Sequence, residues 1–384
     1  MDFSLNAAEQ SVEDLCRNIL EDLVTEPSLR ELDASETWVH ARAWQALGEA
    51  GLLGVAIPEK YGGSEIGLLA LCALLRQLGR ATAPSPALAT LVMGALPIAR
   101  HGSEPQKLAW LPGAATGKHF LTAALPAHGH GDDLPPSVRA SQQGTAFRLD
   151  GVCKLVAGLP AARRVLMAAE DTNGRVIVLI VDPKSPGISL SRSMATSGEP
   201  LHDINLLDVR IASSEVLGSP DDGRSVATYL YECATLGVCA LSLGVAERAL
   251  RMTARYATER HQFGKPIGSF QAVSQRAADS YIDVAAMKVS LWQAAYRLGA
   301  GLPCERELAI AKLCAADGGH RVVAAAQHIH AGMGFDRDYP LHRSFLWAKQ
   351  LEMTLGGASV QVARLGALFA ADARQPEAGL RATE

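Results

Sequence analysis

The sequence predicts an α+β chain of three domains, and three observations indicate their order. Residues 1–115 carry apolar side chains at helical spacing, as in SVEDLCRNILEDLV. Residues 116–222 hold short β-prone runs broken by Pro, Gly and Asp. Helical patterns return from residue 223 onward. We therefore expect an N-terminal all-α domain (1–115), a middle antiparallel β domain (116–222) and a C-terminal four-helix bundle (223–384).

Within the first domain, three stretches carry the helical pattern: residues 11–24, 36–53 and 68–81. The second is closed by IPEKYGG, whose proline and glycines end a helix. The third, LLALCALLRQLGRA, is apolar nearly all round, which is typical of a buried helix.

The middle domain is indicated by the runs RVIVLIV and INLLDVRI, the second of which partly alternates apolar and polar residues. We expect a small antiparallel sheet, sandwich- or barrel-like. AHGHGDDLPPS is expected to be a loop, because it combines Gly, Pro and Asp.

The last domain contains four long helical stretches, at about 224–259, 270–298, 306–331 and 341–372. The second has an apolar stripe at steps of three and four, as the inner face of a bundle requires. No GxGxxG follows a predicted strand, which excludes a dinucleotide-binding fold of the βαβ type.

Composition and charge narrow the class of protein. Of 384 residues, 48% are hydrophobic and 20% charged, which argues against disorder. The net charge of -4 provides no basic field for nucleic acid. We find no basic leader before an apolar stretch and no apolar run long enough to cross a bilayer, so we expect a cytoplasmic protein.

The seven cysteines are scattered and form no CxxC pair. A chain of this length does not need disulfides to be stable, so we interpret the cysteines as small buried apolar residues.

The stretch RHQFGKPIGSFQ (260–271) is the first candidate for function. Its turn places Arg260 and Gln271 at the same bend, with Phe263 between them. An arginine fork suits a pyrophosphate, an aromatic face suits a base, and a glutamine suits an adenine edge. The alternative is an arginine that caps helix carbonyls beside a packed phenylalanine.

The second candidate is QHIHAGMGFDRDYPLHR (327–343). Gly332 and Gly334 would let a ligand or another chain approach the backbone, although an ordinary turn between helices explains them equally well. His328 and His330 are two residues apart and would point to different sides of a helix, so we predict no metal site.

The third candidate is LWAKQLEMTLGGASVQVARLG (346–366). Gly356 and Gly357 interrupt a good helical pattern at a cost of about 1 kcal/mol each, and such a kink would make room for another group.

These three segments, in this order, resemble those of the acyl-CoA dehydrogenase family, as does ALGEAGLLGVAIPEKYGG in the first domain. The resemblance covers nearly the whole chain. It implies an oxidoreductase, a flavoprotein with FAD held between subunits. Arg260, Phe263 and Gln271 would hold the adenosine-pyrophosphate half of a neighbour's flavin, helped by the backbone from His328 to Gly332.

The resemblance also exposes departures at the catalytic base. The family removes a proton from Cα of an acyl-CoA with a glutamate, while FAD accepts the hydride from Cβ. The glutamate of most members corresponds to Leu355 here, and that of other members to Ala234. Glu232 and Glu352 are nearby, but Glu232 is turned about 200° from the second position on a helix, and Glu352 precedes the kink. We therefore predict no catalytic residue.

The middle domain departs too. The family's Thr-Glu-Pro and Gly-Ser-Asp segment corresponds to TAALPAHGHGDD here, in which only Pro126 matches the motif. The flavin-stacking segment corresponds to CKLVAGLPAARR, which has no aromatic or hydroxyl residue. The residues that would bind the flavin ring are therefore missing, whereas the residues that would bind the flavin of a neighbouring subunit are present.

This asymmetry, together with YPLHRSFLWAKQLEMTLGGA, resembles the β-type subunit of α2β2 acyl-CoA dehydrogenases that act on steroid side chains in lipid metabolism and steroid degradation. The resemblance implies a catalytic α-type partner, two flavins in a heterotetramer, an acyl-CoA substrate, and electron-transfer flavoprotein or a similar acceptor. Two alternatives stay open: a self-sufficient homotetramer with a displaced base such as Glu232, and a flavin-free scaffold.

Overall fold

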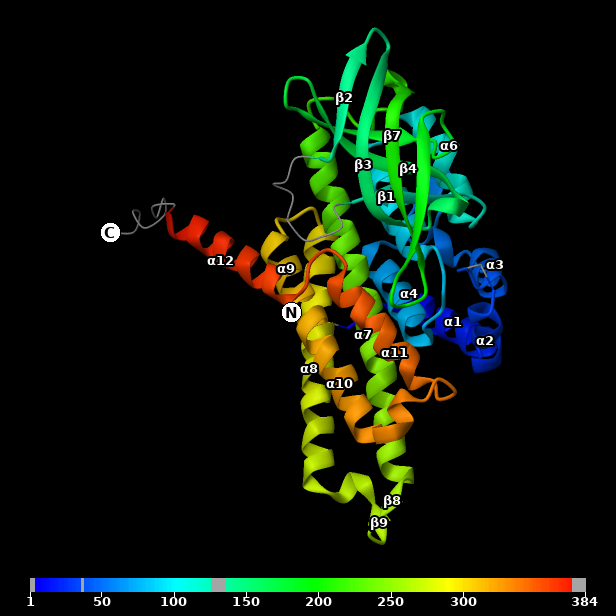
Figure 1. Ribbon diagram of the computed structural model, residues 1–384, viewed down its shortest axis with the longest axis vertical. Helices are drawn as coiled ribbons and strands as arrows, with labels where there is room; N and C mark the ends of the chain where they lie inside the picture. The colour runs from blue at the N-terminus through cyan, green and yellow to red at the C-terminus, as the bar shows by residue number, and fades with distance from the viewer. Residues whose placement is uncertain (1–3, 36–37, 126–135, 375–384) are drawn as a thin grey trace.

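The computed structural model describes residues 4–35, 38–125 and 136–374. In chain order these residues form a group of helices, a sheet and a second group of helices (Figure 1). The first group contains α1 (Ala7–Leu23), α2 (Glu26–Asp33), α3 (Ala41–Glu49), α4 (Leu68–Ala81), the π-helical segment η3 (Leu88–Ala95), α5 (Leu96–His101) and α6 (Glu104–Ala115). The buried, all-round apolar helix expected at 68–81 is α4, and the expected helix at 36–53 is shorter because Gly51 at φ 71° ends it.

The sheet contains seven strands: β1 (Phe120–Ala124), β2 (Val138–Gln143), β3 (Ala146–Ala157), β4 (Ala162–Asp171), β5 (Val176–Val181), β6 (Ile188–Met194) and β7 (Pro200–Ala212). Their order is β1-β4-β2-β3-β7-β6, and β5 pairs with β4. Four pairings are antiparallel, as expected, but β4 runs parallel to both β1 and β2. The sheet is therefore mixed, because alternation along a strand marks its buried face but not the direction of its neighbour. The expected loop AHGHGDDLPPS lies almost entirely outside the described residues.

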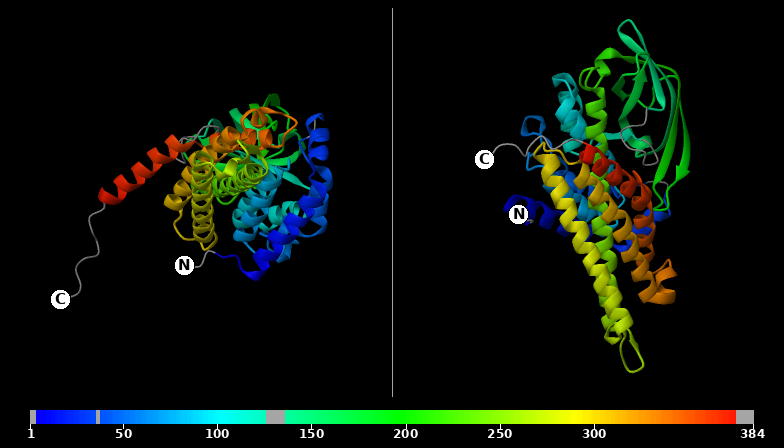
Figure 2. Two further views of the ribbon diagram at one scale, coloured as in Figure 1. Left: turned by 90° about the horizontal axis from the view of Figure 1, so that it is seen from below. Right: turned by 90° about the vertical axis from the view of Figure 1, so that its left-hand side faces the viewer.

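The second helical group contains α7 (Gly223–Glu259), the hairpin strands β8 (His261–Gln262) and β9 (Lys265–Pro266), α8 (Gln271–Gly299), α9 (Glu305–Leu313), the π-helical segment η7 (Cys314–Gly318), α10 (Gly319–His330), α11 (Leu341–Met353) and α12 (Ala358–Arg374). The expected helix at 306–331 is the run from α9 to α10. The expected helix at 341–372 is divided into α11 and α12, and α12 projects away from the bundle (Figures 1 and 2).

The longest helix, α7, corrects one expectation. Its length and apolar composition would let it cross a membrane, contrary to our prediction that no such run exists. However, 89% of its most apolar window is buried inside the protein. It is a core helix, against which α4, α8, α10 and α11 pack.

Two glycines set the crossing of α4 and α7. A Cβ on Gly79 would lie 2.2 Å from the backbone oxygen of Leu241, and one on Gly244 would lie 1.9 Å from that of Arg76. The two backbones therefore touch, which only glycine permits at these positions. This contact fixes the N-terminal helices against the bundle.

A buried ionic network reinforces the crossing. Arg76 donates two hydrogen bonds of 2.8 Å to the carboxylate of Glu247 and one of 2.6 Å to Glu13, which also accepts from Gln77. The bidentate geometry orients α7 relative to α1 and α4. The seven cysteines are all free, and all but the half-buried Cys314 are buried, as the sequence indicated.

The kink between α11 and α12 is held by three side chains. Leu355 adopts φ 60° and Gly356 φ 92°. The Leu355 carbonyl accepts hydrogen bonds from Tyr231 (3.1 Å) and Gln361 (3.2 Å). Lys312, which is fully buried, donates to the carbonyls of Leu351 (3.2 Å) and Glu352 (3.0 Å) at the end of α11. Burial lowers the pKa of Lys312 to about 8.

We predict that Lys312→Met lowers the free energy of unfolding by about 1–3 kcal/mol, because two buried helix-end carbonyls lose their donor. Chemical denaturation of both proteins measures the difference. Lys288→Met on the exposed face of α8 is the control and should change stability by less than about 0.5 kcal/mol.

The same pair of proteins tests the buried charge. The unfolded chain holds the lysine proton more tightly than the folded chain, so this lysine's contribution to stability rises between pH 8 and its ordinary pKa of 10.5. The stability of the wild type relative to Lys312→Met should rise over that interval. A difference that stays constant or falls would contradict this assignment.

Candidate functional site

A cavity of about 380 Å³ lies where the N-terminal helices, the sheet and the bundle meet. Its lining is mostly apolar and includes Trp38, Met93, Leu155, Met194, Trp347 and Leu355. The rings of Trp38 and Trp347 lie 5.7 Å apart at an angle of 31°, on one side of the cavity. Such a hollow, assembled from several parts of the chain, is typical of a small-molecule site.

Leu355 and Ala234, which occupy the family's two positions for the catalytic base, differ in whether they line this cavity. Leu355 lines it, and its left-handed backbone is unfavourable for a leucine. The backbone kink that would direct the side chain of residue 355 towards the cavity is therefore present, but a leucine side chain cannot accept a proton. Ala234 is fully buried in α7 and is not part of the lining.

The two nearby glutamates lie outside the lining. The Oε1 atom of Glu232 is 3.7 Å from the Sγ atom of Cys304, and burial together with this carboxylate raises the pKa of Cys304 to about 12. Glu352 pairs with Lys349 at 2.6 Å and lies 3.6 Å from the Nδ1 atom of His320 on α10. Neither of them reaches the cavity, in agreement with the sequence-based expectation.

Sequence reasoning missed a third carboxylate. Glu199, in the turn between β6 and β7, lines the cavity and is its only charged lining residue among those described. Burial raises the pKa of Glu199 to about 7. Only the fold brings this turn to the cavity, and GEP in the sequence reads as an ordinary turn.

The hairpin at 260–271 forms the free end of the bundle (Figure 1). Phe263 at φ 53° and Gly264 at φ 78° occupy the centre of a two-residue turn, and this conformation suits Asn-Gly better than Phe-Gly. The Phe263 side chain is 93% exposed. Its ring meets the edge of Phe270, with centroids 6.1 Å apart, but most of it is open to solvent. A strained and largely exposed aromatic residue is typical of a role in binding.

Arg260 and Gln271 flank this hairpin and are both exposed. Within the described part of the chain, the guanidinium of Arg260 makes no hydrogen bond or ion pair, and its backbone N–H donates to the Tyr256 carbonyl at the end of α7. Gln271 begins α8, whose N-terminus has no side-chain cap. An uncapped helix N-terminus beside a free arginine suits an anion such as a pyrophosphate.

His328 and Gly332 lie at the end of α10. His328 is exposed and lines an open groove of about 840 Å³ between α8 and α10, which begins at Ala272, next to Gln271. A Cβ on Gly332 would meet no atom within 4 Å, so the backbone there is open to a ligand. At Gly334, by contrast, an added Cβ would lie 2.9 Å from the backbone oxygen of Gln327, so the chain packs closely there.

The hairpin and the glycine turn are joined by stacked rings. Tyr256, one turn before Arg260, stacks on His330 with ring centroids 4.3 Å apart. His330 is buried, and its ring nitrogens contact the Ala326 carbonyl and the Tyr339 hydroxyl. This histidine is structural, and among the described residues no His, Cys, Asp and Glu cluster could hold a metal ion.

The two regions differ in their fit to FAD. The free guanidinium, aromatic face and amide of the hairpin suit adenosine and pyrophosphate. The cavity suits the flavin ring poorly, because a reduced flavin carries negative charge and the one charged lining residue is Glu199. The middle-domain segment around Pro126 lies outside the described residues, and 155–157 of the second flavin segment contribute only apolar side chains.

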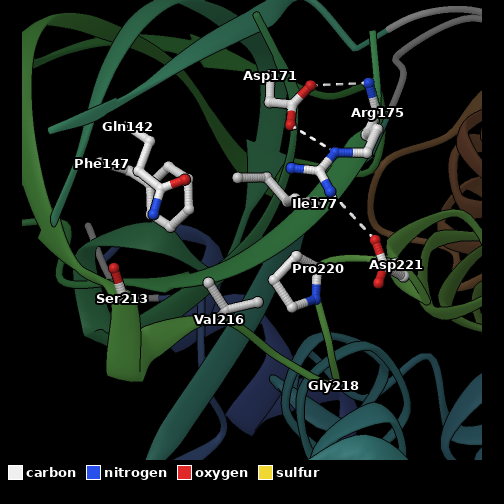
Figure 3. Close-up of a pocket in the computed structure, with 10 residues that line it drawn as sticks. All are labelled: Gln142, Phe147, Asp171, Arg175, Ile177, Ser213, Val216, Gly218, Pro220 and Asp221. Carbon is white, nitrogen blue, oxygen red and sulfur yellow. Dashed lines mark hydrogen bonds and ion pairs between the residues drawn. The ribbon is translucent and has the colours of Figure 1, made fainter. Parts of the chain in front are cut away.

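A further hollow of about 300 Å³ lies in the sheet group (Figure 3). Arg175 is its cation, but Asp171 and Asp221 already neutralise it at 2.8 and 3.1 Å. It therefore offers no free charge to a ligand, and we assign it no function.

Comparisons with known proteins agree with this arrangement. Residues 6–118 match the N-terminal domain of acyl-CoA dehydrogenases, and residues 221–368 match their C-terminal domain. The chain is 37% identical to the acyl-CoA dehydrogenase FadE27 of Mycobacterium tuberculosis over 95% of its length and 98% of the relative's.

Solved structures give the same result. The ChsE4-ChsE5 complex of Mycobacterium tuberculosis has a chain with 38% identity and a TM-score of 0.90, covering 96% of this chain and 99% of that one. The steroid acyl-CoA dehydrogenase Tcur3481-Tcur3483, as a G363A variant, gives 40% identity and a TM-score of 0.89 over the same shares. Identity of this extent, over whole chains with the same order of domains, means that this chain belongs to the acyl-CoA dehydrogenase family.

Proposed function

We propose that this chain is the non-catalytic subunit of a cytoplasmic, hetero-oligomeric acyl-CoA dehydrogenase and completes the FAD site of a catalytic partner. Arg260, Phe263 and Gln271 bind the adenosine-pyrophosphate half of the cofactor, together with the backbone from His328 to Gly332. The complex introduces an α,β double bond into an acyl-CoA, and we propose a steroid side-chain thioester as its substrate.

One observation carries this proposal: the chain keeps an exposed, strained hairpin that suits a dinucleotide, but has Leu355 and Ala234 where the family has its base. The energetic cost of the strained backbone at Phe263 is offset only if a ligand binds there. A chain that acted alone would need both the dinucleotide-binding residues and the catalytic base.

FAD, when bound, accepts the hydride from Cβ of the acyl group. The residues of this chain orient it: the Arg260 fork neutralises the pyrophosphate, the Phe263 ring covers the base, and Gln271 hydrogen-bonds its edge. The proton from Cα goes to a carboxylate of the partner, because none stands at either base position here.

The substrate class and the partners rest on relatives. Two similar structures are complexes of two named proteins, ChsE4-ChsE5 and Tcur3481-Tcur3483, and the second is described as a steroid acyl-CoA dehydrogenase. A structure of 25% identity, from work on the electron transferring flavoprotein of Acidaminococcus fermentans, supports such a protein as the electron acceptor.

The first test co-expresses the chain with a candidate α subunit and measures FAD per heterodimer. We predict that Arg260→Ala lowers the FAD content at least tenfold, since a charge-assisted bidentate contact is worth about 1.5–3 kcal/mol. The control is Arg224→Ala, which changes an exposed arginine at the other end of α7. This substitution should leave the FAD content unchanged.

If the Arg260→Ala complex retains FAD at the wild-type level, Arg260 does not bind the cofactor and the proposed FAD site is wrong. A wild-type complex that contains no FAD would instead favour the flavin-free scaffold.

Phe263→Asn separates binding from stability. Asparagine tolerates a positive φ and the phenylalanine ring is exposed, so the isolated chain should gain up to about 1 kcal/mol of stability. The complex should at the same time lose FAD, because the aromatic face is gone. Thermal unfolding and flavin absorbance measure the two effects, and a variant that loses stability and keeps FAD contradicts the assignment.

The alternative of a self-sufficient enzyme now depends on Glu199, because Glu232 faces Cys304 and only Glu199 reaches the cavity. We predict that the chain expressed alone is colourless and does not oxidise acyl-CoA. A yellow preparation that turns over, and whose activity is lost in Glu199→Gln but not in Glu232→Gln, would establish the alternative.

A further inference from the structure

The two segments assigned to the dinucleotide lie at the ends of two different helices. Arg260 directly follows the end of α7, and Gly332 comes two residues after the end of α10. One ligand can contact both segments only where the two helix ends lie at a suitable distance from each other. Segments that are already held in their bound positions bind more tightly, because less conformational entropy is lost on association. The contacts that join the two helix ends therefore affect the affinity of the site.

Three aromatic rings join these ends. The ring of Tyr256, in the last turn of α7, stacks on that of His330, the last residue of α10, with centroids 4.3 Å apart and planes inclined by 23°. The ring of Tyr339, which lies just before α11, is 5.3 Å from that of His330. We call Tyr256, His330 and Tyr339 the aromatic bridge.

Hydrogen bonds hold the central ring of the aromatic bridge in one orientation. The Nδ1 atom of His330 lies 2.8 Å from the Ala326 carbonyl oxygen, and its Nε2 atom lies 3.2 Å from the Tyr339 hydroxyl. Because a carbonyl oxygen only accepts, Nδ1 carries the proton, and Nε2 of the neutral ring accepts from the hydroxyl. The Tyr256 hydroxyl, by contrast, makes no hydrogen bond within the described residues, so Tyr256 contributes the face of its ring.

The backbone carries the position of Tyr256 into the hairpin. The Tyr256 carbonyl accepts a hydrogen bond of 2.8 Å from the Arg260 N–H, and the Arg260 carbonyl accepts one of 2.8 Å from the Ile267 N–H. A Cβ on Gly268 would lie 3.1 Å from the Ala257 carbonyl oxygen, so the base of the hairpin packs on the last turn of α7. A shift of Tyr256 would therefore move Arg260 as well.

The other end of the aromatic bridge leads into the glycine turn. His330 is buried and directly precedes Ala331, where the chain leaves α10 at φ 51° and ψ −130°. An added Cβ on Gly332 would meet no atom within 4 Å, so no packed neighbour holds the chain at that residue. The position of the open backbone therefore depends on the residues that flank it, and His330 is the one that faces the hairpin.

We propose that Tyr256 and His330 are positioning residues for the dinucleotide: their stacked rings fix the distance between the Arg260 hairpin and the Gly332 backbone, so that both contact one molecule of FAD. This inference rests on the function proposed above. Neither residue contacts the cofactor in this assignment, because His330 is buried and Tyr256 acts on Arg260 through the backbone.

The test measures FAD affinity in the complex with a candidate α subunit, by titrating FAD into the deflavinated complex and following flavin fluorescence. Tyr256→Leu should weaken FAD binding about fivefold or more, because the loss of one aromatic stack lets the hairpin shift. His330→Leu should have the same effect. Tyr256→Phe keeps the ring and lacks only a hydroxyl without a partner, so its FAD affinity should stay within about twofold of the wild type.

The matched control is Tyr229→Leu. Tyr229 is a half-buried tyrosine at the opposite end of α7, and its ring also meets a histidine, His101, with centroids 5.4 Å apart. This variant should lose stability in thermal unfolding, as Tyr256→Leu does, but keep its FAD affinity. If both variants lose FAD affinity equally, the effect is a general loss of stability and the proposal is overturned. A Tyr256→Phe variant that binds FAD as weakly as Tyr256→Leu overturns it too.

A double variant tests whether Tyr256 acts through Arg260. In the Arg260→Ala background, the effect of Tyr256→Leu should fall to about twofold or less, because the contact that it positions is already lost. Two full and additive effects would overturn the positioning role.

The single variants separate this inference from the function on which it rests. If Arg260→Ala weakens FAD binding and Tyr256→Leu does not, the positioning role is wrong and the proposed function stands. If neither changes FAD binding, both are wrong.

Discussion

The backbone contact between α4 and α7 is the constraint on which the rest of the structure depends. Gly79 and Gly244 let the two helices touch, and Arg76 fixes their orientation by its two carboxylate partners. Because α7 is rigid and spans the bundle, one crossing fixes both of its ends. Its N-terminal end packs against β5 of the sheet, its middle lines the cavity through Leu241, and its C-terminal end leads into the hairpin (Figure 1).

The hairpin and the cavity differ in chemical character. At the hairpin, a cationic side chain and a largely exposed aromatic side chain face solvent, which is favourable for a charged, flat ligand. The cavity lining is mostly apolar, and Glu199 is its one charged residue among those described. Under the proposed division of labour between subunits, this chain would hold the charged cofactor at its hairpin, and the partner would carry out the chemistry.

Among the described residues, three of the seven non-glycine residues with positive φ lie in the three candidate segments. Phe263, Ala331 and Leu355 all have positive φ, and Ala331, at φ 51° and ψ −130°, stands beside the open Gly332. At Leu355 the strained conformation persists although the residue cannot act as a base. The hydrogen bonds that Lys312 and Tyr231 donate to backbone carbonyls hold the kink, and they do not depend on the side chain at position 355.

The sequence by itself determined the order of helices, sheet and bundle, the buried α4, and the interruption of the last helix at Gly356. These follow from local periodicity, from glycine conformation and from motifs that lie within short segments. The parallel pairing of β4 and the burial of α7 were decided only by the tertiary structure. So was the placing of Glu199 in a cavity with Trp347, because these depend on contacts between residues far apart in the chain, which no local pattern encodes.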